Sequence, residues 1–459
     1  MYDCTEIHQS VRQMRDIMSF RKTFFAATVV TVVIAMLLIA VPDVAADHVA
    51  GEEPSDYANI SWIAVCSILV FIMTPGVALF YGGMLRKQSM TSVIAQTLLA
   101  MAVMGISWFA VGYSLAFSEG NVLIGGFDFV FFNNVSADII ADGAYIPDME
   151  FAMFQMMFAL ITAGIVLGAC AERIRYTAIT WFLVIWSILV YAPMAHMVWG
   201  GGLLMNLPFG LETLDFAGGT VVHICAGTTG LALAAYLGKR NIRTIKRAHS
   251  IPMVFFGGFL FWFGWFGFNG GSGLAANGQA INAMVVSMVA AVCAMAAWAV
   301  VQYLHVGRVG VLGLAAGSIA GLVAITPGAG YVSPISAVVI GLVGGVVCYF
   351  GTIFMRNKSG IDDALDVMGV HGIGGIWGAI ATGLFAEFNI SGAGGILTTG
   401  DWQLFVGNIV AVIITMVFCF VVSYVIIWVI GKLMRVRATE SEELIGQDLV
   451  EHGEPAYVM

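Results

Sequence analysis

Long apolar stretches divide this chain of 459 residues and constrain its fold more than any other feature. A helix that crosses the hydrocarbon core of a bilayer needs about 20 predominantly apolar residues. Eleven stretches meet that requirement, near 59–80, 91–117, 151–171, 177–198, 218–238, 251–269, 279–304, 309–326, 334–355, 366–386 and 404–431. Only 10% of the residues are charged, against about 25% in soluble domains. The sequence therefore predicts an all-α polytopic membrane protein with eleven transmembrane helices.

The lysine and arginine residues after the first apolar run test this count. They lie only in every second connection between stretches and after the last one, at Arg86, Lys87, Arg173, Arg175, Lys239, Arg240, Arg243, Lys246, Arg247, Arg308, Arg356, Lys358, Lys432, Arg435 and Arg437. Positive residues collect in cytoplasmic loops, and one missed span would break the alternation. We therefore predict that the first helix starts outside and that the C-terminus lies in the cytoplasm. These short basic loops indicate no nucleic-acid partner.

The N-terminal segment has the pattern of a targeting sequence. Four basic residues, the last two being Arg21 and Lys22, precede an apolar run that is followed by the small residue Ala46. A signal peptide combines these features, so residues 1–46 are predicted to be a signal peptide-like segment outside the transport core. Two alternatives stay open, namely that the run spans the membrane uncleaved and that Met18 is the true start.

Two segments share the pattern H-x-x-x-G-x-x-G, one from His223 in the fifth stretch and one from His371 in the tenth. Each has an aspartate upstream, Asp215 and Asp366, and the first and sixth stretches end in F-Y-G-G and F-N-G-G. Since five is odd, two such halves cross the membrane in opposite directions. Substrate paths in inverted repeats lie at the repeat interface near the midplane, so we expect the two histidines to be partners there.

The resulting organisation has five parts. They are the signal peptide-like segment (1–46), a first five-helix half (59–238), a second, inverted five-helix half (251–386), an eleventh helix (404–431) and a cytoplasmic regulatory tail (432–459).

Several longer motifs resemble the ammonium transporter family, and specifically its Amt branch. They are F-Y-G-G-M (80–84), A-E-R-I-R (171–175), A-H-M-V-W-G-G-G (195–202), D-F-A-G-G-T-V-V-H-I (215–224), G-W-F-G-F-N-G-G-S (264–272) and D-V-M-G-V-H-G (366–372). The resemblance covers nearly all of 59–459. It implies an eleven-helix fold with an inverted repeat, a homotrimer with one pore per subunit, and a place in the plasma membrane. The sequence has no ATP motif, so we expect gradients to drive transport and no cofactor.

The resemblance also implies an outer substrate site formed by Phe158, Trp199 and Ser272. Aromatic rings attract a cation, by about 0.5–2 kcal/mol for a good contact, and a hydroxyl accepts a hydrogen bond from ammonium. Potassium has no N–H donors, which is why such a site suits ammonium. Taken singly, these rings read as packing residues or as interfacial aromatic residues.

Below that site, the resemblance implies a pore gate and a polar midpoint. Phe154 and Phe268 correspond to the stacked rings of the gate, and Trp265 lines the lumen. His223 and His371 correspond to the twin histidines of the pore, which contact ammonia and relay a proton. A packing role is the alternative for either histidine alone. A zinc site is disfavoured because no third ligand lies nearby, so no metal is predicted.

Two aspartates are assigned structural and electrostatic roles. Asp215 begins the fifth span, where a carboxylate caps a helix, and the resemblance implies that its charge also favours a cation at the outer site. Asp366 is read as its counterpart in the second half. In the tail, His452-Gly453-Glu454 and Ala456-Tyr457 resemble the end of the family's tail, although Pro455 departs from the family pattern. The resemblance implies a possible PII-type signal protein as partner, since the family's tail often binds one.

The predicted function is therefore ammonium transport. The cation is captured outside and deprotonated, ammonia passes the pore, and the proton crosses separately, so that uptake is electrogenic. Three alternatives remain: an ammonium sensor of the same fold, disfavoured because no signalling domain follows the tail; a Rhesus-like neutral gas channel, disfavoured by Trp199 and Ser272; and a membrane metalloenzyme.

Overall fold

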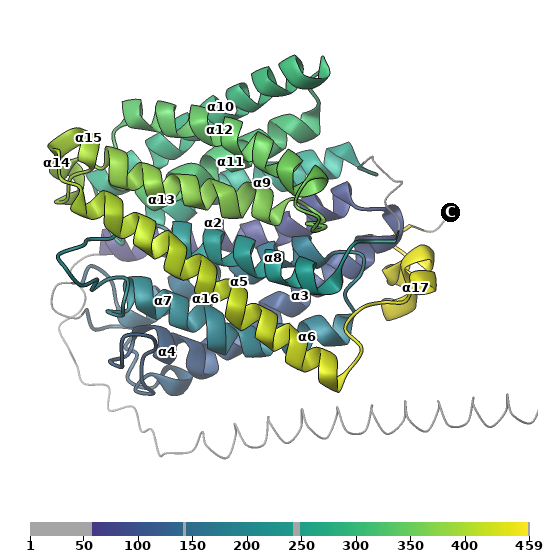
Figure 1. Cartoon of the computed structure of the whole chain (residues 1–459). Helices are drawn as coiled ribbons and strands as arrows, with labels where there is room; N and C mark the ends of the chain where they lie inside the picture. Colours follow the sequence, from purple (N-terminus) through teal and green to yellow (C-terminus); the bar gives the residue numbers. More distant parts are fainter. Residues whose placement is uncertain (1–56, 141–143, 242–247, 458–459) are drawn as a thin grey trace, which may run out of the picture. The chain divides into compact units, whose positions relative to one another are not determined.

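A computed structural model describes residues 57–140, 144–241 and 248–457 of the chain (Figure 1). Within these ranges, eleven helical spans are long and apolar enough to cross a membrane, which confirms the predicted number and places. The uninterrupted ones are α2 (Tyr57–Met84), α5 (Asp148–Cys170), α9 (Ile251–Gly271), α10 (Gly278–Val306), α12 (Pro334–Asn357) and α16 (Gln403–Leu433). The predicted signal peptide-like segment lies outside the described residues.

The remaining five spans contain a change of helix type. They are η1 (Lys87–Ser89) with α3 (Met90–Ser107), η2 (Trp108–Gly112) and α4 (Tyr113–Phe117); α6 (Tyr176–Trp186) with η4 (Ser187–Tyr191) and α7 (Ala192–Trp199); η5 (Gly219–Ile224) with α8 (Cys225–Leu237); α11 (Val311–Ile325) with η6 (Thr326–Gly328); and η7 (Met368–Gly372) with α13 (Ile373–Phe385). The segments η2, η4, η5 and η7 are π-helical, a form that occurs frequently at functional sites.

Corresponding spans of the two halves pack against each other. The first and sixth spans, α2 and α9, lie side by side, and η7 of the tenth span contacts both η5 and α8 of the fifth. Both histidine-bearing spans begin with a π-helical segment, η5 and η7. Matched irregularities at matched positions agree with the predicted five-helix repeat.

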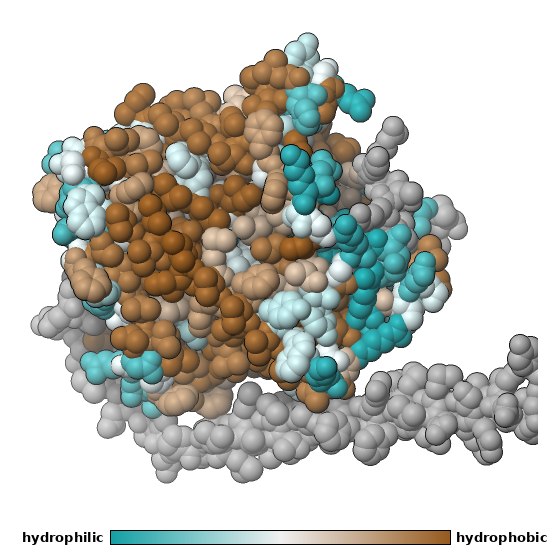
Figure 2. All heavy atoms as spheres, viewed as in Figure 1, coloured by the Kyte–Doolittle hydropathy of each residue, from teal (hydrophilic) through white to brown (hydrophobic). Residues whose placement is uncertain are grey.

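The connections lie at two ends of the helical bundle. The short helices α14 (Phe388–Ser391) and α15 (Ile396–Thr399) lie at one end, and the tail helix α17 (Glu440–Ile445) lies at the other (Figure 1). Apolar side chains cover the face of the spans in Figure 2, and hydrophilic residues gather at the end that carries α17. This distribution is that of a multi-pass membrane protein.

The tail packs on the predicted basic connections. The Arg86 guanidinium donates to the carbonyl oxygen of Glu443 at 2.8 Å, and the backbone N–H of Arg175 donates to Val436 at 2.9 Å. Arg437 reaches the carbonyl oxygen of Leu237 at 2.7 Å. The first, third and fifth connections therefore share one end with the tail, as the alternation of charge predicts. That this end is cytoplasmic stays a prediction.

Buried ion pairs join four connections at the same end. Glu172 pairs with Arg86 at 2.8 Å and with Arg240 at 3.1 Å, and Asp362 pairs with Arg240 at 3.0 Å and with Arg173 at 3.3 Å. Burial would raise the pKa of Asp362, but its bonds to Arg240 prevail and lower the pKa to about 2. Burial lowers the pKa of Arg173 to about 10, so both groups remain charged at neutral pH.

Candidate functional site

Two of the three predicted outer residues, Trp199 and Ser272, lie at the ends of their helices opposite the tail, whereas Phe158 lies in the middle of α5. Phe158 of α5 and Trp199, the last residue of α7, meet edge to face with ring centroids 6.1 Å apart. Ser272 follows α9, and its hydroxyl donates to the carbonyl oxygen of Phe268 at 2.8 Å, which leaves the lone pairs of the hydroxyl as acceptors. Phe158 is buried, whereas Trp199 and Ser272 are half-buried. The three residues offer aromatic rings and a hydrogen-bond acceptor at the end of the bundle opposite the tail.

The ring that stacks on Phe268 is Phe158, and the predicted pairing with Phe154 is wrong. The centroids of Phe158 and Phe268 lie 4.3 Å apart, with 29° between the ring planes. Phe154 instead meets Phe158 edge to face at 5.0 Å. Phe154 and Phe158 are one helical turn apart and lie on the same face of α5. Of the two rings, Phe158 is the one at the level of Phe268 along the helix. Phe158 therefore contacts both Trp199 of the predicted outer site and Phe268 of the stacked pair.

Below the stacked pair, the two predicted histidines meet. The Nδ1 atoms of His223 and His371 lie 3.3 Å apart. His223 also stacks between its partner and two aromatic rings, with centroids 5.3 Å from Trp265 and 5.9 Å from Phe268. The Trp265 indole donates to the Thr326 hydroxyl at 2.9 Å, which fixes the ring. The Nε2 atom of His223 is buried and has no hydrogen-bond partner within the described part of the chain.

Glycines set the approach of the two histidine-bearing helices. A methyl group at Gly227 would stand 2.4 Å from the Cα atom of Gly372, and one at Gly375 would stand 2.9 Å from the carbonyl oxygen of Gly219. Real Cβ atoms do not come so close to backbone. The glycines of the repeated pattern therefore allow backbone to lie directly on backbone at this crossing.

Asp215 caps the fifth span. Its Oδ1 atom accepts the backbone N–H groups of Gly218 and Gly219 at 2.8 and 2.6 Å, and its Oδ2 atom accepts the N–H of Thr220 at 2.8 Å. The Thr220 hydroxyl donates to the same Oδ2 atom. The carbonyl oxygen of Asp215 accepts the Trp199 indole N–H at 2.9 Å. One residue thus orders both the start of the histidine-bearing helix and a ring of the outer site.

The prediction that Asp366 caps the tenth span is wrong. Asp366 has a left-handed backbone with φ of 61°, and its carboxylate accepts from Arg356 Nε at 2.8 Å instead of facing the helix start. Asp363 makes the cap, since it accepts the N–H groups of Val367 and Met368 at 3.0 and 2.8 Å.

The sequence contained a signal for Asp363. It stands eight residues before His371, as Asp215 stands eight residues before His223, whereas Asp366 stands only five residues before. Burial, and then the charge of Asp366, raise the pKa of Asp363 to about 7. This carboxyl group is therefore the structural counterpart of Asp215, in a more buried setting.

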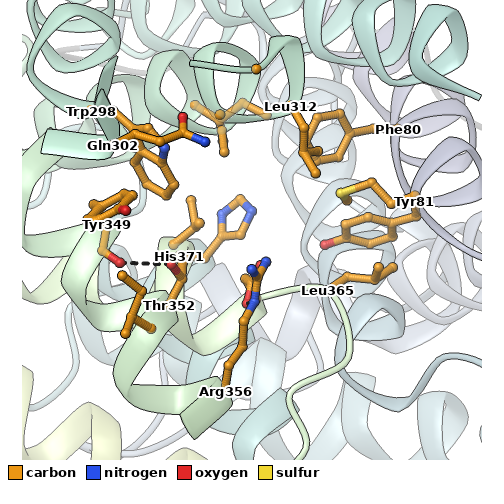
Figure 3. A pocket seen from close by; sticks show the side chains of 18 of the residues that line it. Phe80, Tyr81, Trp298, Gln302, Leu312, Tyr349, Thr352, Arg356, Leu365 and His371 are labelled. Carbon is orange, nitrogen blue, oxygen red and sulfur yellow. Dashed lines mark hydrogen bonds and ion pairs between the residues drawn. The ribbon is translucent and has the colours of Figure 1, made fainter. Parts of the chain in front are cut away.

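A cavity of 310 Å³ reaches His371 from the tail end (Figure 3). Its lining includes His371, Asp366, Arg356, Tyr349, Trp298 and Tyr81. Figure 3 shows the Arg356 guanidinium and the His371 ring pointing into it. Apart from His371 and Asp366, sequence reasoning did not single out these residues. On the other side of the histidines, the rings of Phe158, Phe268 and Trp265 are almost fully buried.

Comparisons with known proteins agree with this arrangement. The sequence model of the Ammonium Transporter Family matches residues 61–457. An ammonium transporter of Bacillus subtilis (strain 168) is 47% identical over 393 residues, which cover 85% of this chain and 96% of that protein. The crystal structure of Saccharomyces cerevisiae Mep2 is 35% identical with a TM-score of 0.76, covering 83% of this chain and 90% of Mep2. A solved structure described as a sensor Amt protein is 28% identical with a TM-score of 0.79, covering 86% and 98%. The chain therefore belongs to the ammonium transporter family.

Proposed function

We propose that this protein takes up ammonium by capturing the cation at Phe158, Trp199 and Ser272 and passing ammonia along His223 and His371. The observation that carries the proposal is the unpartnered Nε2 atom of His223. Buried polar atoms nearly always have a hydrogen-bond partner, so an unpartnered one next to the aromatic stack calls for an explanation. A small N–H-bearing substrate in transit supplies it.

Selectivity begins at the outer rings. The face of the half-buried Trp199 ring and the Ser272 hydroxyl offer two kinds of contact, cation–π attraction and a hydrogen-bond acceptor. Both cations are attracted to the ring and to the hydroxyl oxygen, but only ammonium donates directional N–H hydrogen bonds to Ser272. Because Trp199 is tied to Asp215 through its indole N–H, the ring is held in place before the cation arrives, which reduces the ordering cost of binding.

Deprotonation follows from the stacked rings. Phe158 and Phe268 are buried and 4.3 Å apart between centroids, so a cation that passes them must lose its water. Taking an unpaired charge into such surroundings costs far more than taking a neutral amine. Ammonia therefore passes to the histidines, and the proton crosses by a separate route and carries the charge.

The direct test is current recording in proteoliposomes that contain the full chain. Pulses of ammonium should give a current, and equal pulses of potassium should give none. Ammonium uptake without current would replace the proposal with a neutral gas channel of the Rhesus type. Absence of both uptake and current in correctly folded protein would contradict transport altogether.

A sensor of the same fold is the second candidate. It is favoured by the likeness to the solved sensor Amt protein and by a tail that packs on three connections. A sensor would bind ammonium and change the exposure of its tail at concentrations that produce no flux. Measuring tail proteolysis and ammonium flux on the same samples separates the two.

We extend the proposal to the setting of the molecule. The chain works as a homotrimer in the plasma membrane, with two inverted halves (59–238 and 251–386) and an eleventh helix (404–431). The tail (432–459) lies in the cytoplasm and is available to a PII-type signal protein. Cysteine accessibility at the tail in intact cells tests the orientation, and the mass of the detergent-solubilised protein tests the trimer.

A further inference from the structure

We infer that Asn408, on the eleventh helix and outside the repeat, is a positioning residue for the outer cation site. The inference rests on the function proposed above. It assigns the eleventh helix a part in substrate recognition, although no side chain of that helix belongs to the site itself.

The amide group of Asn408 holds the connection that precedes the fifth span. Its Oδ1 atom accepts the backbone N–H of Leu214 at 3.0 Å, and its Nδ2 atom donates to the carbonyl oxygens of Leu214 at 3.4 Å and of Ala379 at 2.8 Å. The side chain is 2% exposed. All of its N–H donors are used, and the three contacts join the eleventh helix, the tenth helix and the connection.

The neighbouring Gly407 gives independent support. A methyl group there would stand 1.8 Å from the carbonyl oxygen of Glu212. Only glycine lets the connection lie on the helix at this height. Gly407 and Asn408 together therefore form the contact surface for residues 212–214, which we call the seat. Gly407 contributes by its lack of a side chain and Asn408 by its hydrogen bonds.

The seat is joined directly to the site. Leu214 is bonded to Asp215, whose carboxylate caps the fifth span and whose carbonyl oxygen holds the Trp199 indole at 2.9 Å. Trp199 in turn meets Phe158, with centroids 6.1 Å apart. A shift of Leu214 away from the eleventh helix would therefore move the acceptor that fixes the Trp199 ring.

A small cavity beside the Asn408 side chain shows what loss of its amide group would change. Leu214, Asp215, Thr220 and Asn408 line a space of 10 Å³ between the helices. A water molecule needs about that volume as a minimum, together with polar partners. Truncation of Asn408 would enlarge the space beside the Asp215 carboxylate and admit water there, which would loosen the cap.

The expected signature is a change in affinity and not in the capacity of the pore, since the hydrogen bonds of Asn408 reach neither the histidines nor the stacked rings directly. Asn408→Ala should raise the apparent KM for ammonium about tenfold, because it leaves buried backbone groups of Leu214 unpaired. The maximal current should stay within about twofold of the unmodified protein. Asn408→Leu, which fills the volume but lacks the bonds, should behave alike. Gly407→Ala should raise the KM by displacing the connection.

Thr415→Val is the matched control. Thr415 is also fully buried on α16, two turns further along, and its hydroxyl has no hydrogen-bond partner within the described residues. Its substitution should leave the KM unchanged. Thermal melting in detergent shows that each variant is folded, and Asn408→Leu or Gly407→Ala replaces any variant that is not.

A double-mutant cycle with Trp199→Phe separates positioning from general destabilisation. Phenylalanine lacks the indole N–H, so the carbonyl oxygen of Asp215 cannot hold its ring. Loss of Asn408 should then have little further effect, and the KM increases of the two single variants should not multiply in the double variant. Multiplicative effects, an unchanged KM with a reduced maximal current, or an equal KM change in Thr415→Val would overturn the inference. If the unmodified protein gives no ammonium current, the proposed function fails first, and the cycle then reports nothing about Asn408.

Discussion

His223 and His371 share a contact between their Nδ1 atoms, 3.3 Å apart, although 148 positions separate them in the chain. Each ring uses one nitrogen for its partner, so the hydrogen bond holds one proton between two neutral rings. The Nε2 atom of His223 has no partner among the described residues, and in the proposed function it contacts ammonia. Whichever ring donates in the shared bond, the Nδ1 contact orients both rings.

Removing one imidazole ring of the histidine pair should reduce transport. His371→Ala leaves Nδ1 of His223 buried without its partner, and we expect the ammonium-driven current to fall by about tenfold or more. His305→Ala is the control, because His305 lines the same cavity but pairs with the Tyr349 hydroxyl at 2.8 Å. Equal currents in the two variants would show that the pair has no specific part in conduction.

The two neighbouring phenylalanines should differ in their effect on affinity. Phe158 contacts both Trp199 and Phe268, whereas Phe154 contacts Phe158 from the side. Phe158→Leu removes one cation–π partner and should raise the apparent KM for ammonium between about two- and thirtyfold. Phe154→Leu should leave the KM near its original value. Concentration series of ammonium currents measure both, and a larger effect of Phe154→Leu would reverse the assignment.

Asp215 should be needed for stability as well as for transport. Asp215→Ala leaves the N–H groups of Gly218, Gly219 and Thr220 without their acceptor. Loss of such a cap costs about 0.5–2 kcal/mol of the free energy of unfolding. We expect a lower melting temperature and no transport, with Asp215→Asn between this variant and the unmodified protein. Full transport by a folded Asp215→Ala variant would remove the residue from the mechanism.

Asp363 should make stability depend on pH. Its pKa is raised to about 7 in the folded protein from an ordinary value of 3.8, so the folded state binds a proton more tightly than the unfolded state. The resulting stabilisation is complete below about pH 4 and is lost as the pH rises through 7. In Asp363→Asn, melting temperatures measured from pH 4 to 8 should fall less with rising pH than in the unmodified protein. Parallel curves would contradict this assignment.

The tail should detach when its buried carboxylate is removed. Glu443 is almost fully buried, pairs with Arg437 at 2.7 Å and accepts the Asn241 N–H at 3.0 Å. Glu443→Ala leaves these groups unpaired, so limited proteolysis should cut the tail several-fold faster. Glu440 is exposed on the same helix, and Glu440→Ala should be cut at the original rate. Identical cleavage of both variants would mean that Glu443 does not hold the tail.

The spans and the histidine pair could be predicted because each depends on a pattern that the chain carries by itself. Apolar length determines a span, and a repeated histidine in an inverted repeat indicates its own partner. Phe154 and Phe158 show where such reasoning ends. The two rings lie on one face of α5, and the position of α9 along the axis of α5 determines which ring contacts Phe268. The spacing to His371 could have identified Asp363 as the cap, but it could not predict the left-handed backbone of Asp366 or its contact with Arg356. Likewise, the contacts of Asn408 depend on the path of residues 212–214, which no periodic sequence pattern predicts.

The glycine crossing between the two halves has a mechanical consequence. Because Gly227 and Gly372 touch through their backbones, no rotamer change can alter the distance between the helices there. The spacing of the two histidine-bearing helices is thus set by backbone contact alone, and any increase in it breaks the packing of both helices at this point.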